Sequence, residues 1–313
     1  MYSHNTLKVF ALTANPELGA EICTCLDAAP GGISVSEFAD GELFIRLDEN
    51  VRGTDAFAVQ STCRPANRNL MELLITIDTL KRASAGRITA VLPYYGYARQ
   101  DKKDKPRVPI SAKLVADLIT AAGADRVLAV DLHANQIQGY FNLPVDHLFA
   151  LPVFLDHLRS RSFDNLCVVS PDAGGTERAR AFAKRLHVPL AIADKRRPQP
   201  NVAVITHIIG DVEGCDTLIV DDIVDTAGTL TETASALKKH GARRVFACCT
   251  HGVLSPPAIE RINASAIDEL LVTNTIPAPE VSSPRIHRLS VAALLADAIK
   301  RIHEESSVSS LFV

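Results

Sequence analysis

The amino-acid sequence predicts an α/β protein whose strands are mostly parallel and flanked by helices. Short apolar runs alternate with amphipathic stretches along the whole chain, and several of the apolar runs end in polar, loop-like residues. The length of 313 residues suggests two domains, at roughly 100–200 residues each. We place the boundary near Phe149–Pro152, which gives domains of residues 1–150 and 151–313.

Four segments carry apolar residues at the 3.6-residue spacing of a helix with one buried face. They are Asn69–Ala83, Ser111–Gly123, Leu230–Gly241 and a segment that begins at Ser290. The second one ends at glycine, a residue that commonly closes helices. We assign these apolar stripes to the core and expect no chemistry from them.

Four apolar runs with strand-like composition lead directly into polar residues. Ile88–Leu92 precedes Tyr94–Asp101, Val127–Val130 precedes Asp131–His133, Leu166–Ser170 precedes Pro171–Gly175, and Leu218–Val220 precedes Asp221 and Asp222. In parallel α/β sheets, ligands bind at the carboxyl ends of the strands. The pattern therefore predicts binding sites along that edge of each sheet.

The composition limits the partners and the compartment. A net charge of −3 argues against a broadly basic nucleic-acid surface, and no run approaches the roughly 18 apolar residues of a membrane span. The seven cysteines include no C-x-x-C pair, so we expect no zinc site. Cys167, Cys248 and Cys249 lie in apolar runs, which is typical of reduced core cysteines. The first residues lack the pattern of a signal peptide, and we expect a cytoplasmic protein with no nucleic-acid or membrane partner.

The strongest local pattern is Leu218–Leu230, in which an apolar strand is followed by two acids, a loop of small residues and a helix. Backbone N–H groups at a helix start, together with threonine hydroxyls, bind anions, and Gly228 lets the backbone approach an oxyanion closely. Thr229 and Glu232 have the spacing of a capping box. Because acids repel phosphate but suit sugar hydroxyls, a metal or an electron-poor carbon, the pattern fits a sugar phosphate. A capped strand–helix turn without a ligand fits it too, and no P-loop motif is present.

This run resembles the phosphoribosyl diphosphate motif of the type I phosphoribosyltransferases, and the likeness extends along the chain. Five further motifs are similar, in order, to those of the class I ribose-phosphate diphosphokinases: Phe38–Glu42, Gln60–Cys63, Tyr94–Asp101, Asp131–His133 and Asp194–Pro198. The tail Ser307–Phe312 is similar as well. The resemblance implies two phosphoribosyltransferase-like domains, each a mostly parallel sheet flanked by helices. It also implies transfer of the β,γ-diphosphoryl group of ATP to the 1-hydroxyl of ribose 5-phosphate, which gives AMP and 5-phosphoribosyl 1-diphosphate for nucleotide, histidine and tryptophan biosynthesis.

The same resemblance implies which residues hold the substrates. Those for ribose 5-phosphate are Asp221, Asp222, Asp225, Thr226, Ala227, Gly228, Thr229 and Arg197. Those for ATP are Phe38 as the adenine stacker, Asp40, Glu42, Arg99 and Gln100. In the family the Phe38 segment reaches the active site of a neighbouring subunit. A lesser expectation is that Gln60–Cys63 forms a second phosphate-facing loop.

Further expectations from the resemblance concern metal, catalysis and assembly. His133 and Asp172 match the Mg²⁺ positions of the family, and Lys195 and Arg197 match the catalytic residues of a mobile flap. The family forms hexamers with allosteric sites at subunit contacts. Two stretches depart from its pattern: Arg64 and Arg68 stand where small or acidic residues are expected, and Lys102–Pro106 replaces a more arginine-rich run.

Other functions are compatible with parts of the sequence. A type I phosphoribosyltransferase would share the phosphate loop, but Phe38–Glu42, Arg99-Gln100 and Lys195–Arg197 suit an ATP donor. A non-catalytic protein that associates with synthase subunits would be expected to lack the flap or the phosphate loop, and both motifs are present. A nucleic-acid-binding protein is disfavoured by the charge.

Overall fold

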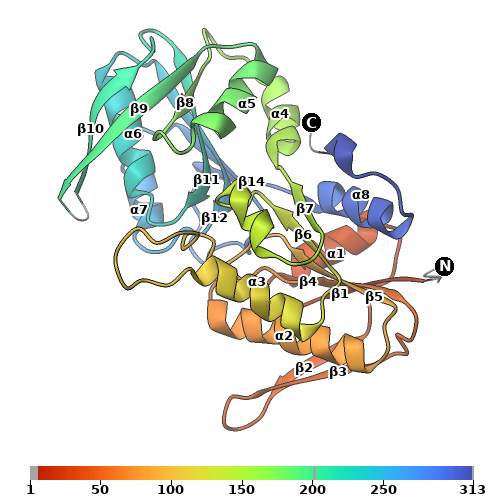
Figure 1. Ribbon diagram of the computed structural model, residues 1–313. Helices are drawn as coiled ribbons and strands as arrows, with labels where there is room; N and C mark the ends of the chain where they lie inside the picture. The colour runs from red at the N-terminus through yellow and green to blue at the C-terminus, as the bar shows by residue number, and fades with distance from the viewer. Residues whose placement is uncertain (1–5, 200–201, 312–313) are drawn as a thin grey trace. The chain divides into compact units, whose positions relative to one another are not determined.

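The computed structural model describes residues 6–199 and 202–311, and within 195–206 it describes no side chains. The chain divides into two compact units. The first contains the described residues up to Phe149, Thr275–Pro277 and the residues from Ser290 onward, and the second contains Ala150–Asn274 and Ala278–Leu289. Each unit is an α/β layer structure built on a mostly parallel sheet, which confirms the predicted fold class (Figure 1).

The first unit contains a five-stranded parallel sheet in the order β1-β4-β5-β6-β7. Its strands are β1 (Leu7–Ala11), β4 (Asp55–Val59), β5 (Arg87–Leu92), β6 (Arg126–Val130) and β7 (Val145–Leu148). Its helices are α1 (Pro16–Cys25), α2 (Ala66–Arg82), α3 (Ser111–Ala122) and α8 (Ala292–His303), with short 3₁₀ turns at Asn135–Tyr140 and Ser309–Leu311. A separate antiparallel hairpin consists of β2 (Ile33–Glu37) and β3 (Leu43–Leu47).

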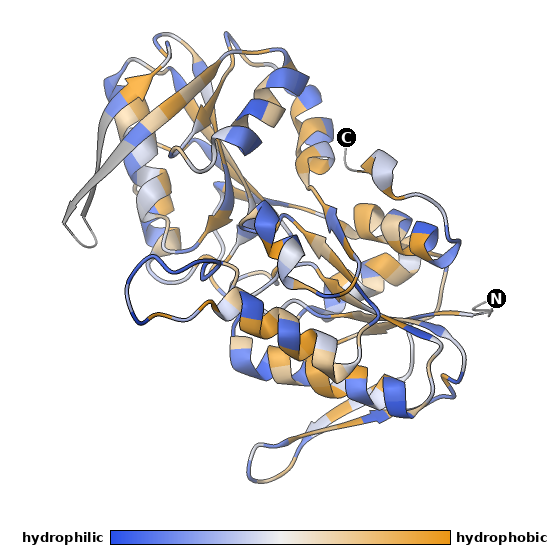
Figure 2. Ribbon diagram, in the orientation of Figure 1, coloured by the Kyte–Doolittle hydropathy of each residue, from blue (hydrophilic) through white to orange (hydrophobic). Residues whose placement is uncertain are grey.

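The core of the first unit follows from the predicted helical stripes. Leu73, Ile77 and Leu80 of α2 and Ile119 of α3 are fully buried, and they pack with the small side chains of the central strands. Adjacent residues of β4 are all buried, so both faces of this sheet are covered, as expected for parallel strands. The central strands β4 and β5 are accordingly mostly apolar after their first residue, whereas the helices carry both apolar and polar residues (Figure 2).

The last helix, α8, belongs to the first unit although it follows the second unit in the chain. It packs against α1. Arg87 at the start of β5 donates to both carboxylate oxygens of Asp55 and, at 2.8 Å, to the carbonyl oxygen of Ile302. His303 contacts the same carboxylate through Nδ1 at 2.9 Å. The end of α8 is therefore fixed to the beginning of two central strands.

The second unit contains a seven-stranded sheet in the order β10-β9-β8-β11-β12-β13-β14, with only the β9–β10 pair antiparallel. Its strands are β8 (Cys167–Ser170), β9 (Leu190–Gln199), β10 (Val202–Ile209), β11 (Asp216–Val224), β12 (Arg244–Gly252), β13 (Glu269–Thr273) and β14 (Ile286–Leu289). Its helices are α4 (Leu151–Arg159), α5 (Thr176–Leu186), α6 (Gly228–Lys239) and α7 (Ala258–Asn263). No helix among the described residues of the chain is long and apolar enough to cross a membrane.

Some element boundaries differ from the sequence-based expectation. β11 does not end before its two acids but continues to Val224, because its backbone keeps pairing with β12 as far as Gly252. The last helix begins at Ala292 and not at Ser290, whose hydroxyl accepts the N–H of Ala292 at 3.1 Å. The two antiparallel hairpins were not predicted, although Ile33–Glu37 of β2 alternates apolar and polar residues.

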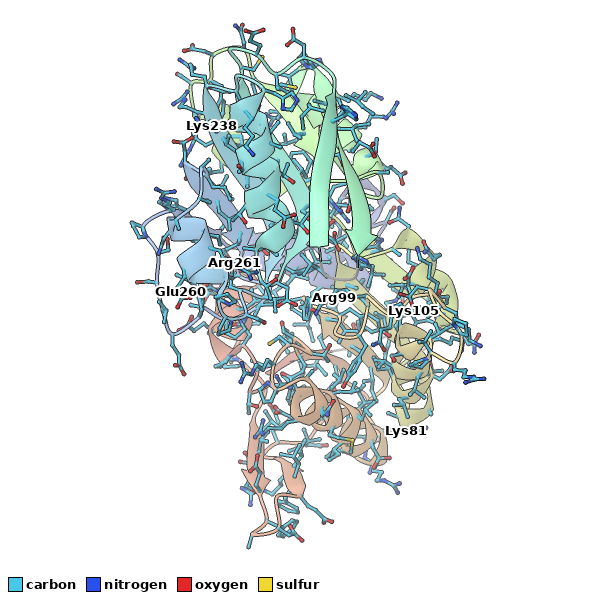
Figure 3. The ribbon with its side chains drawn as sticks, turned by 90° about the vertical axis from the view of Figure 1, so that its left-hand side faces the viewer. Lys81, Arg99, Lys105, Lys238, Glu260 and Arg261 are labelled. Atoms are coloured by element: carbon cyan, nitrogen blue, oxygen red, sulfur yellow. The ribbon has the colours of Figure 1, made fainter. Side chains whose placement is uncertain are left out.

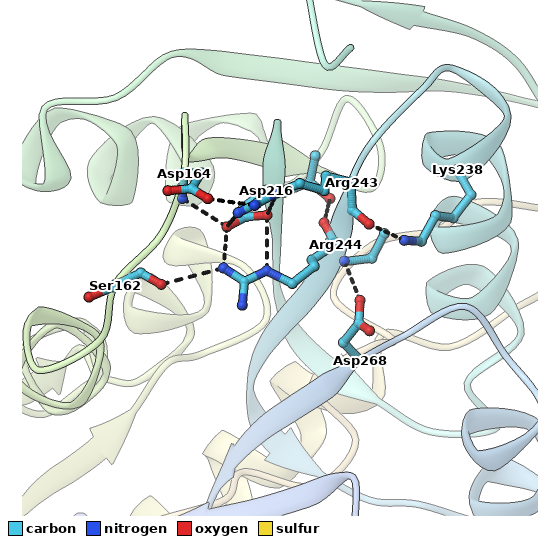
Figure 4. Close-up of polar contacts among 9 residues, drawn as sticks. Ser162, Asp164, Asp216, Lys238, Arg243, Arg244 and Asp268 are labelled. Atoms are coloured by element: carbon cyan, nitrogen blue, oxygen red, sulfur yellow. Dashed lines mark hydrogen bonds and ion pairs between the residues drawn. The ribbon is translucent and has the colours of Figure 1, made fainter. Parts of the chain in front are cut away.

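The start of β11 is held by a buried carboxylate. Asp216 is fully buried and accepts hydrogen bonds from Arg243 at 2.8 and 3.0 Å, from Arg244 at 2.5 and 3.1 Å, and from the N–H of Asp164 at 2.9 Å (Figure 4). Burial alone would raise the pKa of Asp216, but the hydrogen bonds from Arg244 and Arg243 hold it well below its usual range. This network fixes the strand whose other end carries the candidate phosphate loop.

Asp216→Asn should lower the free energy of unfolding by about 2 kcal/mol at neutral pH, because it removes charge-assisted hydrogen bonds. The pKa of Asp216 is lower in the folded state, so its contribution is complete above pH ~4 and is lost as pH falls below that value. The free energy of unfolding, measured with urea between pH 7 and pH 3, should therefore depend less steeply on pH in Asp216→Asn than in wild type. Asp297→Asn, which removes an exposed i,i+4 pair with Arg301, is the control and should change little. Parallel curves for Asp216→Asn and wild type would contradict this account.

Candidate functional site

Two loops and a two-stranded ribbon of the second unit begin at one edge of its sheet. β9, β8 and β11 are adjacent and parallel, so their carboxyl ends lie side by side. The loop Pro171–Gly175 follows β8, and Asp225–Ala227 follows β11. Only Leu190–Ile192 of β9 pair with β8, and the rest of β9 continues past this edge as a two-stranded ribbon with β10. The predicted phosphate loop, metal residue and flap are thus joined to neighbouring strands.

The loop between β11 and α6 has the backbone shape of an anion site. Ala227 is buried and left-handed, with φ of +60°, and it directly precedes the first residue of α6, Gly228. The first N–H groups of a helix have no intrahelical acceptor, and among the described residues no side chain caps this helix. The predicted capping box of Thr229 and Glu232 is wrong, because the helix starts at Gly228 and Thr229 already lies in its first turn. The uncapped turn leaves that end of α6 suited to an anion.

A residue that the sequence interpretation did not single out supports this loop. Arg261 on α7, which Figure 3 labels, donates from Nη1 to the carbonyl oxygen of Thr226 at 3.0 Å. A carbonyl fixed in this way orients the peptide that follows it toward Ala227. Arg261 lies in a short amphipathic stretch whose pattern resembles any surface helix, so no local signal marks it.

The paired acids at the end of β11 are close together and only partly neutralised. The N–H of Asp222 donates to Oδ1 of Asp221 at 2.9 Å. Arg178 of α5 donates to Oδ1 of Asp222 at 3.1 Å, while its distance to Asp221 is 4.0 Å. Burial and the neighbouring carboxylate of Asp222 raise the pKa of Asp221 well above its usual value, against the opposing effect of Arg178. Hydroxyl donors or a cation at this position would stabilise the charged form of the pair.

Asp172 lies in the turn after β8. Its Oδ1 accepts the N–H of Gly175 at 2.9 Å, and its carbonyl oxygen accepts the hydroxyl of Ser170 at 2.6 Å. These bonds fix the direction of a half-buried carboxylate beside the start of α5. The predicted flap residues Lys195 and Arg197 lie in β9, where Lys195 is paired with Ile205, and their side chains lie outside the described part of the structure.

In the first unit, the predicted adenine-binding residues lie at the tip of the β2–β3 hairpin. The N–H of Phe38 donates to the carbonyl oxygen of Glu42 at 2.8 Å, and Oδ1 of Asp40 accepts the N–H of Glu42 at 3.2 Å. Gly41 has φ of +91°, a conformation that glycine adopts without strain. Phe38 is 55% exposed and forms an edge contact with Phe44 at 5.7 Å between ring centres. The hairpin thus displays a large aromatic surface to solvent.

Arg99 and Gln100 lie in the turn after β5, and both are exposed (Figure 3 labels Arg99). The carbonyl oxygen of Gln100 accepts the N–H of Ala112 at 3.2 Å, which ties the turn to α3. Gly96 is required in this turn, because a Cβ there would lie 2.3 Å from the carbonyl oxygen of Thr62. The close approach of these two loops fixes the segment that presents Arg99.

The loop Gln60–Cys63 is a structural support, and the expectation that it faces a phosphate is wrong. All four residues are buried, and the hydroxyls of Ser61 and Thr62 donate to the carbonyl oxygens of Thr275 and Tyr94. Thr62 also accepts the N–H of Gly96 at 2.6 Å. The small polar residues after this strand form hydrogen bonds with backbone groups of the neighbouring loops. The sequence alone does not distinguish this role from phosphate binding, because both roles use the same residue types.

His133 is exposed in the turn after β6. The preceding residue, Leu132, donates its N–H to Nε2 of the buried His147 at 2.8 Å. His147 is on β7, and its other ring nitrogen contacts the amide of Gln138 at 3.2 Å. No sequence pattern selects His147, since a histidine in a strand usually belongs to the core. Among the described residues no three His, Cys, Asp or Glu side chains converge in the manner of a metal site.

Two family models match this chain. Residues 7–123 match the N-terminal domain of ribose phosphate pyrophosphokinase, and residues 195–313 match the phosphoribosyl synthetase-associated domain. Among curated proteins, the ribose-phosphate pyrophosphokinase of Oceanobacillus iheyensis is 56% identical over 312 residues, covering 99% of this chain and 98% of the relative. The corresponding protein of Bacillus subtilis is 53% identical, with the same coverage of both chains.

A solved structure shares both the sequence and the fold. The crystal structure of phosphoribosylpyrophosphate synthetase from Mycobacterium smegmatis superimposes with a TM-score of 0.90 at 45% identity. The superposition covers 96% of this chain and 100% of the other. The similarity therefore extends over nearly the whole chain.

Proposed function

This chain belongs to the ribose-phosphate pyrophosphokinase family, and from that premise we propose how its residues carry out the reaction of the family. The enzyme transfers the β,γ-diphosphoryl group of ATP to the 1-hydroxyl of ribose 5-phosphate and thereby forms 5-phosphoribosyl 1-diphosphate and AMP. The observation that carries this assignment to particular residues is the β11–α6 connection, where two adjacent acids are followed by an uncapped helix start. The acids suit the hydroxyl groups of a sugar phosphate, and the helix start suits its phosphate group.

Ribose 5-phosphate lies with its phosphate on the N–H groups and hydroxyls of Asp225–Thr229, and with its 2- and 3-hydroxyls donating to Asp221 and Asp222. The raised pKa of Asp221 supports this orientation, because hydroxyl donors relieve the repulsion between the two carboxylates. The backbone N–H groups provide positive partial charge without a lysine or arginine in the loop itself. Arg197 adds charge from the flap.

ATP is held by the side chains of the first unit. Phe38 stacks on adenine, Asp40 and Glu42 read the polar edge of the base, and Arg99 with Gln100 contacts the remainder of the nucleotide. The exposure of Phe38 supports this role, since a large aromatic side chain that is half in solvent offers a stacking surface. Asp40 is already engaged by the N–H of Glu42, which fixes its direction.

Mg²⁺ fits Asp172 better than it fits His133. Mg²⁺ prefers oxygen ligands and usually takes one or two carboxylates together with substrate phosphates, so the oriented carboxylate of Asp172 matches its chemistry. His133 has the exposure needed to contact a hydrated ion, and we propose it as the second residue for the same metal. When bound, the ion neutralises charge on the phosphates of ATP. The sparse donor set agrees with a metal that arrives with its nucleotide.

Lys195 stabilises the transferring diphosphoryl group, and Arg197 reaches the substrate phosphates as a planar fork. The support for this role is the position of both residues on the part of β9 that extends past β8. An isolated two-stranded ribbon is only marginally stable. We therefore propose that the β9–β10 ribbon adopts a second, closed conformation in which it packs over bound substrate. Closure excludes water and limits hydrolysis of ATP.

The assembly and location follow the family. We propose a homohexamer with allosteric control at subunit contacts, supported by exposed apolar side chains on the first unit, which include Phe44, Met71, Leu114 and Leu118. The seven cysteines are all free, and Cys167, Cys248 and Cys249 are buried. Unpaired thiols agree with a reducing compartment, and we place the enzyme in the cytoplasm.

A product assay tests the reaction directly. With ATP, Mg²⁺ and ribose 5-phosphate, AMP and 5-phosphoribosyl 1-diphosphate should form in equal amounts. ADP in place of AMP would indicate γ-phosphoryl transfer and would contradict the mechanism. A folded oligomer that binds ribose 5-phosphate without turnover would favour the non-catalytic associated protein.

Asp172→Asn should raise the Mg²⁺ concentration for half-maximal activity by about tenfold, the lower end of the range for altered metal sites, because substrate phosphates continue to bind the ion. The asparagine oxygen can still accept the N–H of Gly175, so the turn should keep its shape. Asp211→Asn, at an exposed acid of the same unit, is the matched control. An unchanged Mg²⁺ requirement in Asp172→Asn would remove this residue from the ligand set.

A further inference from the structure

The β2–β3 hairpin needs an external support to present Phe38 in one place. Its two strands pair only with each other, from Ile33–Leu47 to Glu37–Leu43, and isolated two-stranded hairpins are marginally stable. In Figure 1 the hairpin lies beside α2, and β3 contacts that helix. The residues proposed to bind adenine come immediately after Glu37, the last residue of β2. The position of Glu37 therefore decides where the adenine-binding tip begins.

Glu37 is bound by an arginine that the sequence singled out as unusual. Arg68, in the first turn of α2, donates from Nε to Oε1 of Glu37 at 2.7 Å. Its Nη1 donates to Oγ1 of Thr13 and to Oε2 of Glu72, both at 3.0 Å. The guanidinium thus connects the hairpin to the loop after β1 and to the body of α2.

The two acids that contact Arg68 are not equivalent. The side chain of Glu72 is completely buried, and it also accepts the N–H of Thr13 at 2.8 Å. The side chain of Glu37 is 46% exposed. The buried acid therefore holds the guanidinium in one orientation, and the exposed acid is the group that this fixed guanidinium positions. Glu37, with Glu72 assisting, raises the pKa of Arg68, which remains charged at any physiological pH.

We propose that Arg68 is a positioning residue for ATP: it clamps Glu37 against α2 and so sets the place and angle at which Phe38, Asp40 and Glu42 are presented. The proposal rests on the adenine-binding role of that tip. An arginine is required, because a planar guanidinium contacts Glu37, Thr13 and Glu72 in three directions, which a lysine ammonium on a flexible stem does not reproduce. The clamp touches neither substrate, so its effect should appear in the use of ATP alone.

The test is a double-mutant cycle that consists of wild type, Glu37→Gln, Arg68→Gln and the double variant. Glu37→Arg is added because it disrupts the Glu37–Arg68 pair more strongly. Glu37→Gln should raise the KM for ATP about three- to fivefold, in line with an exposed ion pair, and Glu37→Arg should raise it further by charge repulsion. Neither change should alter kcat, the KM for ribose 5-phosphate or the unfolding midpoint. Arg68→Gln should raise the KM for ATP equally and also lower stability, because it leaves Glu72 buried without its cation. In the double variant the KM for ATP should be no higher than in either single variant.

A structural readout separates the clamp from the adenine site. Hydrogen exchange at the amides of residues 37–44 should be faster in Glu37→Gln and unchanged in the control Arg82→Gln, which removes an exposed pair with Asp78 at the far end of α2. Unchanged exchange in Glu37→Gln would overturn the clamp. Faster exchange with an unchanged KM for ATP would overturn the positioning role, and Phe38→Ala then shows whether the adenine assignment fails with it. Additive effects on the KM for ATP in the double variant would also contradict the proposal.

Discussion

Lys195→Ala should lower kcat by about a hundred- to a thousandfold, the loss that follows removal of a group aimed at charge in a transition state. The diphosphoryl group carries that charge, and no other lysine lies in β9. Both kcat and kcat/KM should fall by this factor, because we propose that the interaction forms only when the flap closes and not when substrate first binds. AMP formation at saturating substrates is the measurement.

Two further variants make this result specific. Lys184→Ala removes an exposed lysine from α5 in the same unit and should leave turnover unchanged. Lys195→Arg keeps the charge but changes its shape, so activity should be restored only in part. Turnover near that of wild type in a folded Lys195→Ala enzyme would show that the catalytic assignment of Lys195 is wrong.

Ala227→Val should lower kcat/KM for ribose 5-phosphate by about ten- to a hundredfold. Ala227 has φ of +60° and is buried at the helix start, and a β-branched side chain in this conformation is strained by about 1–3 kcal/mol. The loop relieves such strain by moving its N–H groups away from the phosphate. The KM for ATP should change little, because the residues proposed to hold the nucleotide belong to other loops.

Ala227→Gly is the matched control, since glycine adopts the left-handed conformation freely. It should keep kcat/KM for ribose 5-phosphate close to that of wild type. Equal behaviour of the valine and glycine variants would show that the conformation of this residue does not decide binding. Thermal unfolding of both variants separates local distortion from loss of the fold.

The sequence predicted the parts of the fold that follow from periodic burial. The stripes of α2 and α3 gave their positions within a few residues, because the apolar positions face one core. The β2–β3 hairpin has no such stripe: its strands are half exposed and are held by Arg68 through side chains distant in sequence. That kind of support leaves no periodic signal.

The candidate site shows the same division. The β11–α6 loop was found from local order, since acids, small residues and a helix follow one another in the chain. Two arginines that contact this region were missed. Arg178 of α5 binds Asp222 in the strand, and Arg261 of α7 binds the carbonyl oxygen of Thr226 in the loop. In the sequence both have the pattern of ordinary surface residues. Gln60–Cys63 was assigned wrongly for the opposite reason, since buried polar residues that satisfy backbone groups have the same composition as a phosphate loop.

The return of α8 to the first unit has a consequence for how the protein is made. During synthesis β1, α1 and β4 are translated before the second unit, but the helix that packs on α1 and binds Arg87 and Asp55 is translated after it. The second unit, which lies almost entirely between these segments, can complete its sheet while the first still lacks a helix. A premature stop codon just before Ser290 would therefore spare the second unit and leave the first unit with an open apolar face, as a target for chaperones and proteases.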